Sequence, residues 1–265
     1  LSPSTDATGK AAGTDLRAAV AAAVAAIARG EAEKVVLARD VVIRGDAPFD
    51  ARALLAALDA RDPRIAVFGV DGMVGASPET LIRVRDGRFR VRVLAGTGPA
   101  GTADALMASG KDRAEHAFAV ESVLVALGGH VRDVEAPAVP FALELPRLTH
   151  LATDVSGVVA DGSGVLDLVA VLHPTAAVAG TPTAAALDLI RRLEPFDRGR
   201  YAGPVGWVGA RGDGEWAIAL PCARLEPDGS LRAYAGAGIV AASDPAAELA
   251  ETGLKLRAIL DAVGG

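Results

Sequence analysis

The sequence predicts an α+β fold in which helices pack outside mainly antiparallel sheets. Two observations predict it: helical and strand-like segments alternate irregularly instead of repeating as βαβ units, and short strands are joined by tight turns such as Gly-Asp-Gly and Pro-Asp-Gly. With 265 residues, of which 51% are hydrophobic, the chain can bury a large core. We expect one domain over residues 15–262 and a flexible N-terminus over residues 1–14.

Hydrophobic periodicity and turn residues define the elements in order. An Ala-rich helix should end at Gly30, a hairpin should turn at Asp86-Gly87, and a cluster of prolines marks 130–146 as a candidate domain boundary. The predicted elements are helix 16–30, strand 33–43, helix 50–60, strands 64–70, 73–77 and 80–96, helix 111–129, strand 147–160, helices 165–173 and 183–194, three strands within 204–240, and helix 245–262.

Composition excludes several classes of function. The net charge of −6 and the lack of a basic run interleaved with aromatic residues argue against a nucleic-acid surface. A single cysteine, Cys222, rules out an internal disulfide and suits a reducing compartment. The apolar stretch 16–30 is interrupted by Arg17 and Arg29, and the first residues lack a secretory-signal pattern, so we expect a cytoplasmic protein, with a monomer as the default state.

Motifs of several common chemistries are missing or broken. The segment GTGPAG (96–101) matches the dinucleotide-binding fingerprint, but Pro99 interrupts it and no βαβ pattern surrounds it. The four histidines lack the spacing of zinc ligands, and no nucleophile motif or P-loop is present. Nucleophilic hydrolysis and dinucleotide chemistry are therefore unsupported.

Two predicted helices carry pairs of acidic residues three positions apart. In the closing helix, Glu248, Glu251 and Lys255 lie on one stripe, which by itself fits a solvated face with an i,i+4 ion pair between Glu251 and Lys255. Asp112 and Glu115 form a second pair at the start of helix 111–129. Two such carboxylate edges facing each other could hold a hard cation.

Two further ionisable residues stand in apolar surroundings. Lys34 begins a β-branched strand, where burial would lower its pKa toward that of a usable base, although a lysine at a strand end also commonly reaches solvent. Glu79 follows a Ser-Pro turn between strands, where it fits either an inward-pointing carboxylate or a surface one. The residues alone leave these alternatives open.

Nine segments occur in the order and near-spacing of the chorismate-utilising enzymes. They are EKVVLAR (33–39), GASPETL (75–81), LAGT (94–97), KDRAEH (111–116), THLAT (149–153), LHPTAAVAGTP (172–182), LEPFDRGRYAGPVGW (193–207), YAGAGIV (234–240) and ETGLKL (251–256). The chain resembles this family from about residue 15 to 262, and within it is most similar to isochorismate synthases. The resemblance implies two stacked, mainly antiparallel sheets flanked by helices.

The resemblance also implies a reaction. Water would add at C2 of chorismate while the C4 hydroxyl leaves and the ring double bonds shift. Lys34 matches the family's base and Glu79 its acid, and burial would favour the neutral form that each role needs. Aminodeoxychorismate synthases carry a lysine where this chain has Ala95, and anthranilate synthases typically lack a lysine at the Lys34 position. Lys34 together with Ala95 therefore indicates water as the nucleophile.

The same resemblance assigns a metal and a substrate pocket. Glu115 and Glu251 would bind Mg²⁺, and Asp112 and Glu248 would act on it directly or through waters, anchoring the chorismate ring carboxylate. His150 also fits an ordinary packed strand histidine. The residues that would line the substrate pocket are Gly96, Thr97, His150, Ala177, Tyr201, Gly236 and Lys255.

Two departures from the family pattern affect the interpretation. Pro221 stands where the family usually has an arginine that could bind a substrate carboxylate. The additional N-terminal segment typical of the family does not precede the first strand, so we expect a trimmed or naturally short form of reduced stability. The expected activity is Mg²⁺-dependent isochorismate synthesis for menaquinone or siderophore biosynthesis. The alternatives are salicylate synthesis by pyruvate elimination and non-catalytic chorismate binding.

Overall fold

A computed structural model of the chain describes residues 16–62, 65–146 and 148–264. The predicted flexible N-terminus over residues 1–14 lies outside the described residues. The described chain divides into two compact units, each assembled from segments that are distant in the sequence. Unit 1 contains the chain up to Ala76, Val178–Ala202 and the chain from Ala219 onward, and unit 2 contains Ser77–Ala177 and Gly203–Ile218.

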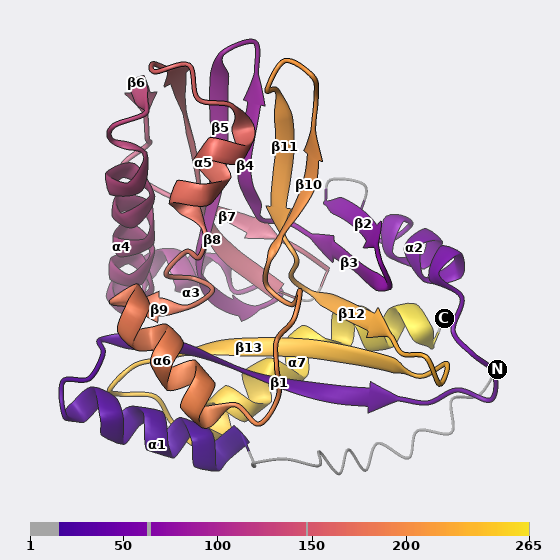
Figure 1. The fold of residues 1–265 in the computed structure, drawn as a ribbon. Helices are drawn as coiled ribbons and strands as arrows, with labels where there is room; N and C mark the ends of the chain where they lie inside the picture. Colours follow the sequence, from indigo (N-terminus) through magenta and orange to yellow (C-terminus); the bar gives the residue numbers. More distant parts are fainter. Residues whose placement is uncertain (1–15, 63–64, 147, 265) are drawn as a thin grey trace. The chain divides into compact units, whose positions relative to one another are not determined.

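Unit 1 is built on a six-stranded sheet with the order β2-β3-β12-β13-β1-β9 (Figure 1). Its strands are β1 (Lys34–Ile43), β2 (Ala66–Val70), β3 (Met73–Ser77), β9 (Gly180–Thr181), β12 (Cys222–Leu225) and β13 (Leu231–Ile239). Its helices are α1 (Leu16–Ala28), α2 (Ala51–Asp59), α6 (Thr183–Leu193) and α7 (Pro245–Val263). The central pair, β1 and β13, runs antiparallel over nine residue pairs.

The two-residue alternation of β13 separates the two faces of this sheet. Its odd-numbered residues from Leu231 to Ile239 are buried in two apolar clusters. One cluster includes α1 and α6 and the other includes α2 and α7, so all four helices pack on the same face of the sheet. The opposite face of β13 carries Tyr234, Gly236 and Gly238.

Unit 2 is built on a seven-stranded sheet with the order β10-β11-β4-β5-β8-β6, and β7 also pairs with β8 (Figure 1). Its strands are β4 (Thr80–Arg85), β5 (Arg88–Pro99), β6 (Val131–Glu135), β7 (Phe141–Glu144), β8 (Leu148–Val159), β10 (Pro204–Val208) and β11 (Gly214–Ile218). Its helices are α3 (Ala103–Ala108), α4 (Gly110–Leu127) and α5 (Val165–Leu172). The predicted hairpin is confirmed, because Arg85 pairs with Arg88 across Asp86-Gly87.

The predicted α+β class with antiparallel sheets is confirmed, and two details of the prediction are wrong. Four strands rather than three lie within 204–240, because the run 216–225 divides at 219–221 into β11 and β12, which belong to different units. Pro221 has no N–H to contribute to a ladder at this break. The candidate boundary at 130–146 instead contains β6 and β7, which both pair with β8.

The helices of the described ranges contain between 6 and 19 residues. None of them combines the length and the apolar character that crossing a bilayer requires.

Two glycines of unit 1 should respond in opposite ways to alanine. Gly180 has φ +128°, and a Cβ there would lie 2.1 Å from the Lys34 carbonyl oxygen. Gly253 lies inside α7, and the nearest atom to a Cβ would be Arg39 Nη2 at 3.8 Å. In urea unfolding, we expect Gly180→Ala to lower the free energy of unfolding by more than about 2 kcal/mol. Gly253→Ala should raise it by about 0.5–1 kcal/mol, and equal shifts in the two variants would contradict this assignment.

Candidate active site

The residues predicted from the family resemblance are divided between the two units. Unit 1 contains Lys34, Tyr201, Gly236, Glu248, Glu251 and Lys255, and unit 2 contains Glu79, Gly96, Thr97, Asp112, Glu115, His150 and Ala177.

Lys34 is the first residue of β1, and its half-buried side chain extends over the glycine face of β13. A Cβ at Gly238 would lie 2.8 Å from Lys34 Cε and 3.4 Å from Lys34 Nζ. Any larger residue would therefore push on the end of the lysine side chain. Gly238 was not among the predicted site residues, although the alternating Ala-Gly-Ala-Gly of β13 indicated that something approaches this strand closely.

Tyr201 and Lys255 converge on the other glycine of β13. The Tyr201 hydroxyl would lie 2.9 Å from a Cβ at Gly236, and Lys255 Nζ donates a hydrogen bond to the Gly236 carbonyl oxygen at 2.9 Å. Tyr201 is only 4% exposed and stacks on Tyr234 with ring centroids 5.0 Å apart. Burial raises the pKa of the Tyr201 phenol well above its ordinary value, so the hydroxyl stays protonated and can donate a hydrogen bond.

The acidic pair of unit 1 lies on α7. Glu248 and Glu251 are three residues apart and partly exposed, and Glu251 forms the expected i,i+4 ion pair with Lys255 at 2.7 Å. The prediction of that pair is confirmed. Lys255 thus connects a carboxylate of α7 with the backbone of β13.

In unit 2, Gly96 brings β5 close to the start of α4. Gly96 has φ +78°, and a Cβ there would lie 3.3 Å from Asp112 Cβ. The register between β5 and β8 shifts between Ala95 and Thr97, and beyond the shift Thr97 Oγ1 is 2.9 Å from His150 Nδ1. The structure therefore brings Gly96 together with Asp112, and Thr97 together with His150.

His116, which follows Glu115, anchors α4 to the sheet of unit 2. Its Nδ1 is 3.1 Å from the Ala95 carbonyl oxygen and its Nε2 is 2.7 Å from Thr153 Oγ1. Because the carbonyl can only accept, Nδ1 carries the hydrogen. Burial lowers the pKa of His116, outweighing the opposing effects of Ala95 and Glu115, so the ring is neutral and Nε2 accepts from the Thr153 hydroxyl. Sequence reasoning gave this histidine no role, because its burial is a tertiary property.

Glu79 and Ala177 line one small pocket of unit 2. The pocket has a volume of about 20 Å³, enough for roughly one water molecule. Arg92 also lines it and is held by Asp154 through two hydrogen bonds of 2.7 and 2.8 Å. The Glu79 amide donates to Ser77 Oγ at 3.2 Å, which fixes the turn that carries the carboxylate.

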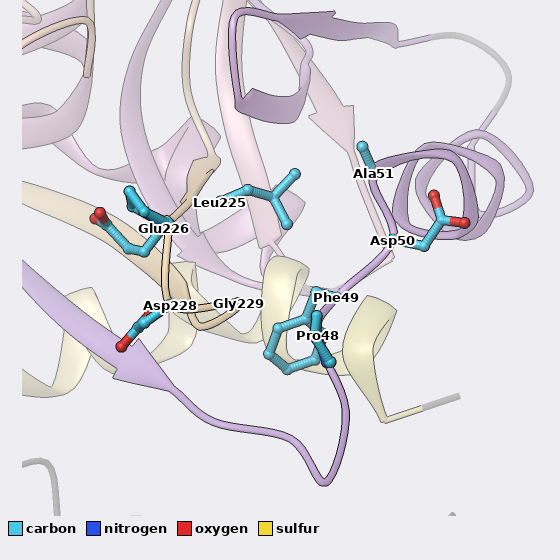
Figure 2. A pocket seen from close by; sticks show the side chains of 9 residues that line it. Pro48, Phe49, Asp50, Ala51, Leu225, Glu226, Asp228 and Gly229 are labelled. Atoms are coloured by element: carbon cyan, nitrogen blue, oxygen red, sulfur yellow. The ribbon is translucent and has the colours of Figure 1, made fainter.

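A wider hollow of about 640 Å³ lies elsewhere in unit 1, where the turn 225–229 meets residues 48–51 (Figure 2). Its carboxylates, Asp50, Glu226 and Asp228, are each ion-paired to an arginine. None of the predicted site residues lines it. The hollow is therefore not a candidate for the active site.

Within the described residues, no group of three or more His, Cys, Asp or Glu side chains could hold a metal ion. Among the predicted ligands, unit 2 contains Asp112 and Glu115 and unit 1 contains Glu248 and Glu251, each pair three residues apart on one helix. Such a donor set contains only oxygen atoms and suits Mg²⁺, which retains several waters and needs few protein ligands.

The family of the chain follows from comparison with known proteins. A family model described as chorismate binding enzyme matches residues 3–264. The chain belongs to the chorismate binding enzyme family. The family predicted from the sequence motifs is thus confirmed.

Its relatives within the chorismate binding enzymes include isochorismate synthases. The chain is 40% identical over 258 residues to the isochorismate synthase EntC of Escherichia coli, covering 92% of this chain and 66% of the relative. It is 37% identical over 270 residues to the isochorismate synthase DhbC of Bacillus subtilis, covering 94% of this chain and 68% of the relative. The chain thus spans about two thirds of the length of these relatives.

A solved structure agrees with these relatives. The menaquinone-specific isochorismate synthase MenF of Escherichia coli matches with a TM-score of 0.85 and 33% identity, covering 93% of this chain and 60% of that one. The fold expected for a chorismate binding enzyme is thereby confirmed.

The anchoring role of His116 can be tested by stability. We expect His116→Phe to lower the free energy of unfolding at pH 7.5 by about 1–3 kcal/mol, because the Ala95 carbonyl and the Thr153 hydroxyl lose their buried partner. His130→Ala is the matched control, since His130 Nδ1 lies 2.7 Å from an Asp161 carboxylate oxygen in a contact where both side chains are about one-third exposed. The control variant should change the free energy of unfolding by less than about 1 kcal/mol in the same urea titration. A smaller loss in His116→Phe than in the control would contradict the anchoring role of His116.

Proposed function

We infer that this chain isomerises chorismate to isochorismate. The observation that carries the inference is that relatives 37–40% identical to the chain along more than nine tenths of its length are isochorismate synthases. Ala95 supports water rather than ammonia as the nucleophile, and the product would enter menaquinone or siderophore biosynthesis.

The reaction needs one base and one acid. Water adds at C2, the hydroxyl leaves from C4 and the ring double bonds shift, so the atoms of substrate and product balance. We assign Lys34 as the base that takes a proton from the attacking water and Glu79 as the acid that protonates the leaving hydroxyl. The space above Gly238 supports an ordered position for the lysine amine, and the Ser77 contact supports an ordered turn at Glu79.

Binding of the substrate uses hydrogen-bond donors and one cation. The protonated Tyr201 hydroxyl and the Lys255 ammonium, which both lie at Gly236, suit the carboxylates of a dianionic substrate. In unit 2, we assign Thr97, His150 and Ala177, together with the close approach of backbone that Gly96 permits, to substrate binding as well.

Mg²⁺ would be held by Glu115 and Glu251, with Asp112 and Glu248 binding it directly or through waters. When bound, it would anchor and neutralise the ring carboxylate of chorismate. The Glu251–Lys255 ion pair keeps a positive charge beside one of these ligands, which limits repulsion while the carboxylates are without a metal.

The function is tested by incubating the purified chain with chorismate, first with Mg²⁺ and then with EDTA, and separating the products by chromatography while measuring pyruvate. We expect isochorismate with Mg²⁺, no pyruvate, and loss of turnover in EDTA. Salicylate with stoichiometric pyruvate would instead identify a salicylate synthase. Saturable chorismate binding without turnover would instead identify a binding protein, in which Pro221 in place of the usual arginine has ended turnover.

The two catalytic roles are tested by substitution. Lys34→Met and Glu79→Gln should each reduce turnover by at least about 100-fold, because each removes a proton-transfer group, while calorimetry still detects Mg²⁺ binding. Gly238→Ala should lower turnover in the same direction, since its Cβ would displace the Lys34 amine. Glu33→Gln, at the exposed neighbouring position, is the matched control and should retain full activity. Retained activity in Lys34→Met or Glu79→Gln would remove that residue from the mechanism.

A further inference from the structure

A buried ion pair lies between α6 and Tyr201 in unit 1. Arg198 Nε and Nη2 bind the two carboxylate oxygens of Glu194 at 2.8 and 2.5 Å. The side chains are only 15% and 2% exposed, so the pair is largely removed from water. Apart from the aromatic ring of Tyr201, its partners are backbone groups of neighbouring segments.

The pair completes one edge of β1. β9 pairs with β1 only at Lys34 and Val35, and the strand continues beyond it. There the Ala38 amide donates to Glu194 at 2.7 Å, and Arg198 Nη2 donates to the Val36 carbonyl at 2.6 Å. A neighbouring strand would otherwise have to satisfy these two backbone groups.

The same arginine also fixes Tyr201, three residues further along the chain. Its guanidinium lies 5.6 Å from the Tyr201 ring centroid, and the Tyr201 amide donates to the Arg198 carbonyl at 2.9 Å. Arg198 Nη1 reaches the Val178 carbonyl at 3.1 Å. One ion pair therefore holds the segment 194–201 against β1, with the Tyr201 hydroxyl over Gly236.

The backbone of β1 requires polar partners at this position. Well-packed apolar side chains often replace a buried ion pair without loss of stability. They could not, however, satisfy the Ala38 amide and the Val36 carbonyl, which lie on β1 opposite Gly236 and Gly238. The charged groups are therefore the hydrogen-bond partners of two backbone groups of β1, the strand that begins with Lys34.

We propose that Glu194 and Arg198 are positioning residues for chorismate: they hold Tyr201 over Gly236 and order the strand that begins with Lys34, without touching substrate themselves. This role rests on the isochorismate synthase activity proposed above. It gives the segment LEPFDRGRY a function within the site.

The test is a double-mutant cycle between Arg198→Lys and Tyr201→Phe. Lysine keeps the positive charge but lacks the fork that reaches Glu194 and two carbonyls together. We expect Arg198→Lys to lower kcat/KM for chorismate roughly tenfold to a hundredfold, mainly through KM. In the Tyr201→Phe background the same change should cost less than in the wild type, because the hydroxyl that Arg198 positions is already gone and only the loss at the Val36 carbonyl of β1 remains.

Arg200→Lys is the matched control. Arg200 lies in the same segment and also forms an arginine–carboxylate pair, with Asp71 at 2.6 Å, but both side chains are more than 60% exposed. KM, kcat and thermal stability should be unchanged. Glu194→Gln, which keeps an oxygen acceptor for the Ala38 amide, enters the same cycle if Arg198→Lys does not fold, and variants without turnover are compared by their chorismate Kd from calorimetry.

The outcomes separate the two levels of inference. An active wild-type chain with equal losses from Arg198→Lys in both backgrounds would overturn the positioning role alone, as would an unchanged KM in that variant. A wild-type chain that neither converts nor binds chorismate would overturn the proposed function and this role with it.

Discussion

The two-residue alternation of β13 is the constraint on which the site of unit 1 depends. Because successive residues of a strand point to opposite faces, one series of apolar side chains packs against the helices. The other series then determines how closely anything can approach the opposite face. With glycine at 236 and 238, Tyr201 and Lys34 lie where side-chain atoms of β13 would otherwise be.

One buried polar group in each unit provides a partner for backbone atoms of the sheet. The two ring nitrogens of His116 form hydrogen bonds with the Ala95 carbonyl and the Thr153 hydroxyl. The Glu194–Arg198 pair forms hydrogen bonds with backbone groups at one edge of β1. Such groups are costly when unpaired and rigid when satisfied. They order the segments that carry the residues assigned to catalysis.

The segment around Pro221 shows how a departure from the family pattern is absorbed. Pro221 lies in the break between β11 and β12, where its carbonyl accepts a hydrogen bond from the Ala76 amide at 3.3 Å. The position therefore keeps a backbone role. What it lacks is a guanidinium, and within unit 1 the donors directed at Gly236 come from Tyr201 and Lys255.

The sequence by itself determined the local features of this protein. Periodicity and capping signals located most helices and strands, and the Asp86-Gly87 turn specified its hairpin, because each depends on residues close together in the chain. The order of the short motifs identified the family. The spacing of Glu251 and Lys255 was likewise enough to predict their ion pair.

Only the tertiary structure decided the rest. The break between β11 and β12 depends on the two units exchanging the chain, and the roles of Gly238, His116 and Arg198 depend on partners up to 204 positions away in the sequence, as in the contact of Lys34 with Gly238. Side-chain burial and close approach between distant segments have no local signature in the sequence. They depend on which segments pack against each face of a strand, and those segments lie far apart along the chain.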